Sequence, residues 1–153
     1  MRRGGFGASQ DDLTSLEGTS TSGVLDYLLD YEKQPDDVDS KMGDPAYASI
    51  NASGGFSPNL NIEHARQRWL FRMVHSKRPL QEKMALFWHN HFATAYSKIA
   101  GVVGAAQATR MMALAPGELP GPRGQIELFR AMALGSFRDL LIEVAKDLSL
   151  IHI

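Results

Sequence analysis

The sequence contains no cysteine, so disulfide bonds, thiolate metal sites and cysteine nucleophiles are all excluded. It has no apolar run of the roughly 18 residues that a membrane helix needs, and no apolar segment follows Arg2 and Arg3 as in an export signal. It also lacks an excess of charge, because 16 basic residues face 17 acidic ones. Without a basic surplus, nucleic acid is not expected as the main partner.

The 153 residues are enough for one domain with a buried core, and 44% of them are hydrophobic. Almost every strong hydrophobic period is helical, and no segment alternates as a strand does. We therefore predict an all-α fold, an irregular multi-helix bundle. Helix-capping residues mark the expected starts of four helices: Ser9, Ser22, Asn61 and Ser136.

A long loop is expected over about 34–61, because this segment is rich in Pro, Gly, Asp and Ser. Its acidic residues are Asp36, Asp37, Asp39 and Asp44. Their spacing lacks the repeated pattern and closing glutamate of a calcium loop, which favours a solvated acidic segment. A second turn-rich segment, 116–124, is expected to be a surface spacer, and one helix is expected over about 101–115 although Gly101 and Gly104 weaken its start.

The stretch MALFWHNHFAT, residues 84–94, lies in a helix that is expected to start near Pro79 and to run to about Tyr96. In a regular helix, His89 and His91 point about 200° apart. The apolar stripe predicts that His91 faces the core, together with Leu80, Met84 and Phe87. It predicts that His89 lies on the other side, together with Glu82, Ala85 and Ala93.

The histidines allow two interpretations. In the first, His91 is a buried structural histidine and His89 caps or lines a surface groove. In the second, His89, Asn90 and Glu82 or a loop residue form a polar site for a ligand or a divalent metal, with Trp88 beside it. Both histidines could bind one metal only if the helix ended near Trp88, because extended residues two apart share a face. A nuclease of the H-N-H type is not supported, because its residues are dispersed over strands and a helix.

The helix expected over 62–75 carries a basic side next to this motif. Its apolar face is formed by Ile62, Ala65, Trp69, Leu70 and Met73. The basic residues in and after it are Arg66, Arg68, Arg72, Lys77 and Arg78. A solvated helix face is the default interpretation, and an anion site that includes Arg72 is the alternative.

Three blocks of the sequence stand out: RRGGFGA at 2–8, WLFRMVHSKRPLQEKMALFWHNHFATAYSK at 69–98 and ALGSFRDLL at 133–141. They resemble those of a known bacterial family, the domain of unknown function 1800. They occur in the family's order, and the F-W-H-x-H-F part of the second block is the most specific. The resemblance implies a mainly helical, commonly exported protein, periplasmic or extracellular, often encoded beside an exported partner. It implies no established activity.

The family pattern continues beyond the third block with a further helix and an acidic Asn/Glu/Arg block. We therefore expect residues 1–147 to be the N-terminal part of a single larger helical domain, hence a fragment. Residues 148–153 are expected to be a non-native tail, similar to translated adaptor sequence in assembled metagenomic reads.

Two functions remain open at this stage, one of them enzymatic. The first is an interaction or assembly role in the cell envelope or extracellular space, with an exported protein partner. The second is a metal-assisted hydrolase, in which His89 and His91 supply metal ligands or a general base and Asn90 and Glu82 orient them.

Overall fold

The computed structural model describes residues 3–42, 56–92, 95–114 and 124–147. Within these ranges the regular structure is entirely helical, which confirms the all-α fold. In chain order the elements are α1 (Gln10–Leu16), α2 (Thr21–Leu29), a 3-10 turn η1 (Tyr31–Lys33), α3 (Val38–Lys41), α4 (Ile62–His75), α5 (Pro79–Phe92), α6 (Tyr96–Val103), α7 (Ala105–Met112), α8 (Gln125–Ala131) and α9 (Phe137–Lys146). None of these helices is both long and apolar enough to cross a bilayer.

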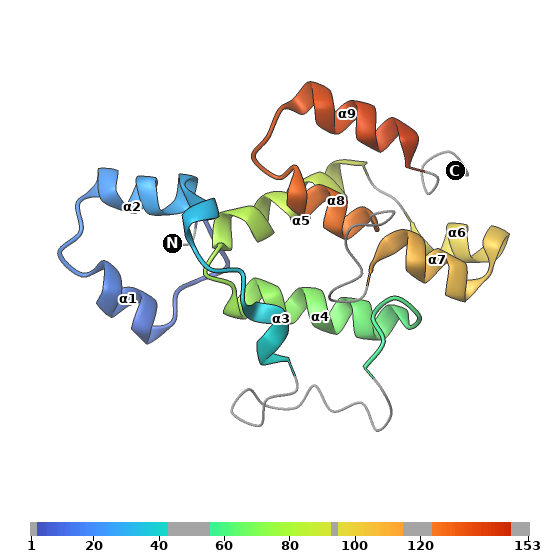
Figure 1. Ribbon diagram of the computed structural model, residues 1–153, viewed down its shortest axis with the longest axis horizontal. Coiled ribbons are helices and arrows are strands. Elements are labelled where there is room, and N and C mark those ends of the chain that lie inside the picture. The colour runs from blue at the N-terminus through green and yellow to red at the C-terminus, as the bar shows by residue number, and fades with distance from the viewer. Residues whose placement is uncertain (1–2, 43–55, 93–94, 115–123, 148–153) are drawn as a thin grey trace.

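The centre of the molecule is built from α4, α5 and α8. Figure 1 shows α1 and α2 at one end, α6 and α7 as a pair at the other, and α9 across the top. Of the contacts between helices, those of α5 with α8 and of α6 with α7 are the most extensive. The short α3 packs on α4 although long stretches of chain separate the two.

The main apolar core lies between α5, α8 and α9. Its buried residues are Ala85, Leu128, Phe129, Leu140 and Val144. Two smaller clusters extend it towards α7 and α6, and Trp69 of α4 packs against both the main cluster and the first of these. The core is therefore a chain of small clusters, which leaves room for polar contacts between the central helices.

Local sequence signals place most helix starts correctly. Ser9 forms a complete capping box with Asp12, and the side chains of Asn61 and Ser136 each accept a hydrogen bond from the first turn of their helices. Pro79 is the first residue of α5, as expected. The cap of α2 is Ser20 and not Ser22, because the hydroxyl of Ser20 accepts the N–H of Gly23.

The loop expected over 34–61 contains structure that the composition did not predict. Val38–Lys41 forms α3, and Val38 is completely buried. Asp44 and the rest of 43–55 lie outside the described residues, as do most of the 116–124 spacer and the 148–153 tail. The acidic segment before residue 43 is therefore packed on the helical core, for reasons that its ion pairs make clear below.

The single helix expected over 101–115 is wrong, because the chain breaks at Gly104. This residue ends α6 and precedes α7 with φ 84° and ψ 158°. That conformation is open almost only to glycine. Its N–H donates to Ala100 and its carbonyl accepts from Ala108, so one glycine closes one helix and opens the next.

We predict that Gly104→Ala lowers the free energy of unfolding by about 1–3 kcal/mol, through backbone strain alone. A Cβ at position 104 meets no atom within 4 Å, so no steric clash contributes. Gly101→Ala is the matched control, since its Cβ also meets nothing and its backbone is helical. The control is expected to raise the free energy of unfolding by about 0.5–1 kcal/mol, and both variants are measured by urea unfolding. Equal effects of the two variants contradict the prediction.

Candidate functional site

The centre of the site is the carboxylate of Glu82 in α5, which is completely buried. Its Oε1 accepts hydrogen bonds from Nε of Arg72 in α4 and Nε of Arg130 in α8, both at 2.8 Å. The side chains of Arg72 and Arg130 are 2% and 9% exposed. One carboxylate oxygen therefore joins the three central helices through two charge-assisted hydrogen bonds.

A second buried carboxylate, Glu127 in α8, extends this arrangement. It accepts a hydrogen bond from Nη1 of Arg68 at 2.9 Å and from the backbone N–H of Leu114 at 3.1 Å. Arg130 lies 3.8 Å away as an ion-pair partner. Arg68 also donates to the carbonyl of Leu114, so α4 and α8 are both fixed to the end of the α7 segment.

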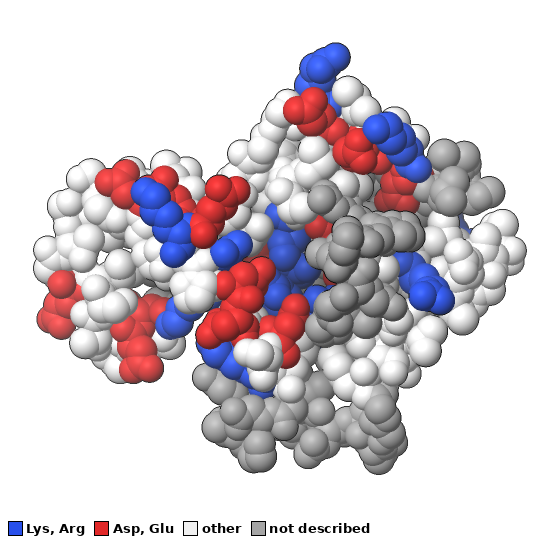
Figure 2. Space-filling view, viewed as in Figure 1, with Lys and Arg blue, Asp and Glu red and all other residues white. Residues whose placement is uncertain are grey.

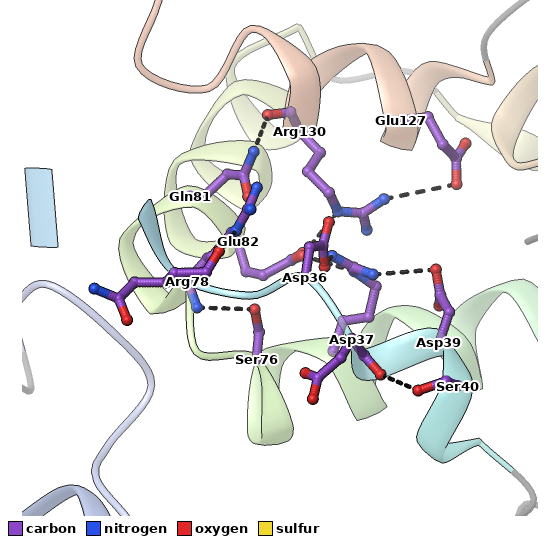
Figure 3. A network of polar contacts seen from close by, with 12 residues as sticks. Asp36, Asp37, Asp39, Ser40, Ser76, Arg78, Gln81, Glu82, Glu127 and Arg130 are labelled. Carbon is purple, nitrogen blue, oxygen red and sulfur yellow. Dashed lines mark hydrogen bonds and ion pairs between the residues drawn. The ribbon is translucent and has the colours of Figure 1, made fainter. Parts of the chain in front are cut away.

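Two aspartates from the segment around α3 complete the cluster on its solvent side. Nε and Nη2 of Arg68 donate to the two oxygens of Asp39 at 3.0 and 2.8 Å, in a forked geometry. Arg72 donates to Asp39 at 3.1 Å and also to Asp36. Figure 3 shows Asp36 and Asp39 directed towards the same centre as Glu82 and Arg130.

We call this group of seven side chains the arginine–carboxylate cluster: Asp36, Asp39, Arg68, Arg72, Glu82, Glu127 and Arg130. On the face shown in Figure 2, basic side chains are visible in the middle of the molecule beside acidic ones.

Burial and charge act in opposite directions on the pKa values of the cluster. Burial alone would raise the pKa of Asp39, but the hydrogen bonds and charge of Arg68, with the charges of Arg72 and Arg130, lower it below its usual value. At Glu127, burial prevails and raises the pKa, despite the charges of Arg130 and Arg68. Burial alone would lower the pKa of Arg72, but the charges of Glu82, Asp36 and Asp39 raise it above its usual value, so Arg72 stays protonated.

The expected face of α5 was wrong, and that of α4 was right only in part, because Ala65 is buried with Ile62 and Trp69 packed against its cluster. Arg68 and Arg72 were assigned to a solvated face, yet they are 7% and 2% exposed, whereas Leu70 is 61% exposed. In α5, Glu82 was assigned to the surface side and is completely buried. The cause is the same in both helices, because arginines and carboxylates neutralise each other in the interior and so take positions that apolar residues usually hold.

The acidic segment was also misjudged, since a solvated loop was expected. Asp36 and Asp39 instead bind the arginines of α4. Of the three aspartates of this segment that the structure describes, Asp37 alone forms an ion pair typical of the surface, with Lys41. Two hints were present in the sequence. Arg68 and Arg72 are spaced i, i+4, and Glu127 and Arg130 are spaced i, i+3, so each pair shares one helix face.

The two histidines point to opposite sides of α5, as their spacing predicts, but the one that faces the core is His89, which is partly buried. Its ring packs edge-on against Trp69 at 5.2 Å and near Phe129 at 6.3 Å. Burial lowers the pKa of His89, and a hydrogen bond with Gln125 offsets part of this effect. His91 is exposed, so the prediction that His91 faces the core is wrong.

The outward side of the motif forms a surface of aromatic rings. Phe87 and Trp88 are 4.8 Å apart between ring centroids, and the Phe87 ring stacks on His91 at 6.0 Å. Trp88 also stacks on Phe137 of α9 at 5.5 Å. We call this surface the aromatic patch: Phe87, Trp88, His91, Phe92 and Phe137. Phe87 and Phe137 are each 50% exposed.

The remaining candidate residues do not gather at one point with the histidines. Nε1 of Trp88 donates to the carbonyl of Ala133 at 3.0 Å, a structural bond between α5 and the turn after α8. Asn90 is exposed. α5 continues to Phe92, so the extended geometry that would bring His89 and His91 to one metal is absent. Among the described residues, no three His, Asp or Glu side chains are placed to hold a metal ion.

A family model described as "Protein of unknown function (DUF1800)" matches residues 1–152. The chain belongs to this family. No curated protein and no solved structure matches it. The family motif F-W-H-x-H-F therefore corresponds, in this member, to one helix with an inward His89 and an outward aromatic patch.

We predict that the two histidines respond differently to the same substitution. Because the folded state lowers the pKa of His89, it holds fewer protons there than the unfolded state, so stability falls as the pH drops through and below about 6.5. His89→Gln should remove this part of the pH dependence between pH 7.5 and 5.5. At pH 7.5 it should lower the unfolding free energy by about 1–3 kcal/mol, through the lost buried hydrogen bond.

His91→Gln is the matched control for this measurement. It should keep the pH dependence of the unmodified chain and stay within about 0.5 kcal/mol of its stability in urea unfolding at each pH. Loss of pH dependence in His91→Gln, or none in His89→Gln, is the result that contradicts the assignment.

Proposed function

We propose that this chain is a helical protein-interaction module of an exported bacterial protein, and that its aromatic patch contacts a partner protein. The observation that carries the proposal is the exposure of Phe87 in α5 and Phe137 in α9, which are each half exposed and both contact the ring of Trp88. Clustered exposed aromatic side chains are typical of the centre of a protein interface.

The charged residues support the same proposal, because they are engaged within the structure. The carboxylate of Glu82, a catalytic candidate, is completely buried and bonded to Arg72 and Arg130. Arg72 is 2% exposed, so it is not part of the surface that the F-W-H-x-H-F motif presents. What the F-W-H-x-H-F motif presents at the surface is therefore aromatic area and an imidazole.

The patch continues along α9, which increases the area available to a partner. Leu141 follows Phe137 by one helical turn and is 42% exposed, and the neighbouring Ile142 is 40% exposed. The exposed Asn90 and His91 supply polar groups at its border. An apolar centre with a polar border is the usual composition of a protein interface.

The metal-assisted hydrolase remains the second candidate, and one observation favours it. Burial lowers the pKa of His89 and so favours the neutral imidazole, the form that binds metals, and its buried Nδ1 has no hydrogen-bond partner. A role for His91 in the same site stays a prediction.

The interaction can be tested by placing a photo-crosslinking amino acid at position 87 of the chain, expressed in a bacterium that carries its gene. Leu70 of α4, which is 61% exposed and apolar, provides the matched control position. We expect one predominant adduct with a different protein from position 87 and none from position 70. Adding Leu141→Glu should reduce that adduct by about tenfold, as expected for a charge placed in an apolar interface.

Three results would contradict the proposal. They are the absence of an adduct from position 87, the same adducts from positions 87 and 70, and an adduct of the chain only with itself.

A further inference from the structure

The arginine–carboxylate cluster has two layers, and only the inner one is sealed from solvent. The inner carboxylates, Glu82 and Glu127, have side chains that are 0% and 9% exposed. The outer ones, Asp36 and Asp39, are 36% and 26% exposed. The outer aspartates can therefore rotate into water, whereas the inner glutamates cannot without opening the helices.

The charges show what the outer aspartates balance. Three buried arginines face two inner carboxylates, so one positive charge is left over, and it is shared by Arg68 and Arg72 on the solvent side. An uncompensated buried charge is strongly unfavourable, so this position requires an anion. In the structure, Asp36 and Asp39 provide two negative charges, one more than this leftover charge.

The geometry of the outer donors fits more than a carboxylate. Nε and Nη2 of Arg68 and Nη1 and Nη2 of Arg72 all point to oxygens of Asp36 and Asp39. Four N–H donors from two adjacent guanidinium groups are the arrangement by which proteins hold phosphate-type oxyanions. The oxygens of the two aspartates occupy the positions that the oxygens of such an anion would take.

The segment that carries the aspartates is held by contacts other than theirs. Val38 lies between them and is completely buried, and Arg78 donates to the carbonyl of Gln34 at 2.8 Å. The backbone can therefore stay in place while the two carboxylates leave.

We infer that Arg68 and Arg72 form a binding site for a phosphate-type oxyanion, and that Asp36 and Asp39 are its internal, displaceable occupants. The site is separate from the aromatic patch and does not depend on the interaction proposed for it. Arg130 adds positive charge behind it, held by Glu82. The ligand can be free phosphate or the phosphate group of a larger molecule, because the arginines recognise the same oxygens in both.

The test replaces the internal occupants by neutral residues of the same shape, in Asp36→Asn/Asp39→Asn. The matched control, Asp30→Asn/Asp37→Asn, removes two carboxylates of neighbouring surface ion pairs, with Lys33 and Lys41. Thermal unfolding is measured in low-millimolar phosphate and in sodium chloride of equal ionic strength. Binding of inorganic phosphate is measured by calorimetric titration. This design cancels the general stabilising effect of phosphate salts, which acts on all variants alike.

We expect the first variant to melt below the unmodified chain in chloride and to recover in phosphate. We also expect it to bind phosphate at least about tenfold more tightly than the unmodified chain, because the competing carboxylates are gone. The control variant should behave as the unmodified chain in both measurements. If the double variant does not fold, Asp36→Asn alone, which removes only one bond to Arg72, is measured in the same way.

A phosphate monoester in place of inorganic phosphate distinguishes the two sources of the ligand. If the variant binds both anions more tightly than the unmodified chain does, the site accepts an esterified phosphate group. If it binds only inorganic phosphate more tightly, the ligand is the free ion. The inference is overturned if the variant gains no more from either anion than the unmodified chain and the control do.

Discussion

The fold depends on one buried carboxylate. Glu82 lies in the first turn of α5 and accepts hydrogen bonds from Arg72 of α4 and Arg130 of α8 through the same oxygen. Once these arginines are buried, they and Arg68 require further anions, which Glu127 supplies from the inside and the α3 segment supplies from the outside. The segment before residue 43 is therefore packed on α4 by charge balance as well as by the burial of Val38.

How far the sequence predicts the structure depends on which interaction decides each element. The helical class, the caps Ser9, Asn61 and Ser136, and Pro79 at the start of α5 follow from local rules, and the structure has them. The faces of α4 and α5 do not follow from local rules. Hydrophobic periodicity assumes that charged side chains lie in water, and this assumption fails where arginines and glutamates from distant segments neutralise one another in the interior. The break at Gly104 was visible only as a weak residue in a helical pattern.

The candidate site was predicted only in part, again because charged side chains from distant segments meet in the interior. Glu82, Arg72 and His89 were candidate site residues. Arg68 and Asp39 were instead assigned to solvated segments, and Arg130 was not noted, because the paired residues are separated by 10 to 48 residues in the sequence. The spacing of the two histidines predicted opposite directions correctly. Which of them is buried depended on the position of Glu82, so the inverted face of α5 exchanged the roles of His89 and His91. In this chain the F-W-H-x-H-F motif accordingly combines an inward His89 with an outward aromatic side.

The most direct test of the central role of Glu82 compares two substitutions that each neutralise one glutamate without changing its shape. Glu82→Gln leaves Arg72 and Arg130 buried without their shared anion, so we expect it to lower the unfolding free energy by about 3–5 kcal/mol. Glu63→Gln removes an exposed ion pair with Arg66 and should change it by less than about 1 kcal/mol. Both are measured by urea unfolding at pH 7 and low salt. A similar small effect of the two substitutions would show that the cluster does not hold the central helices together.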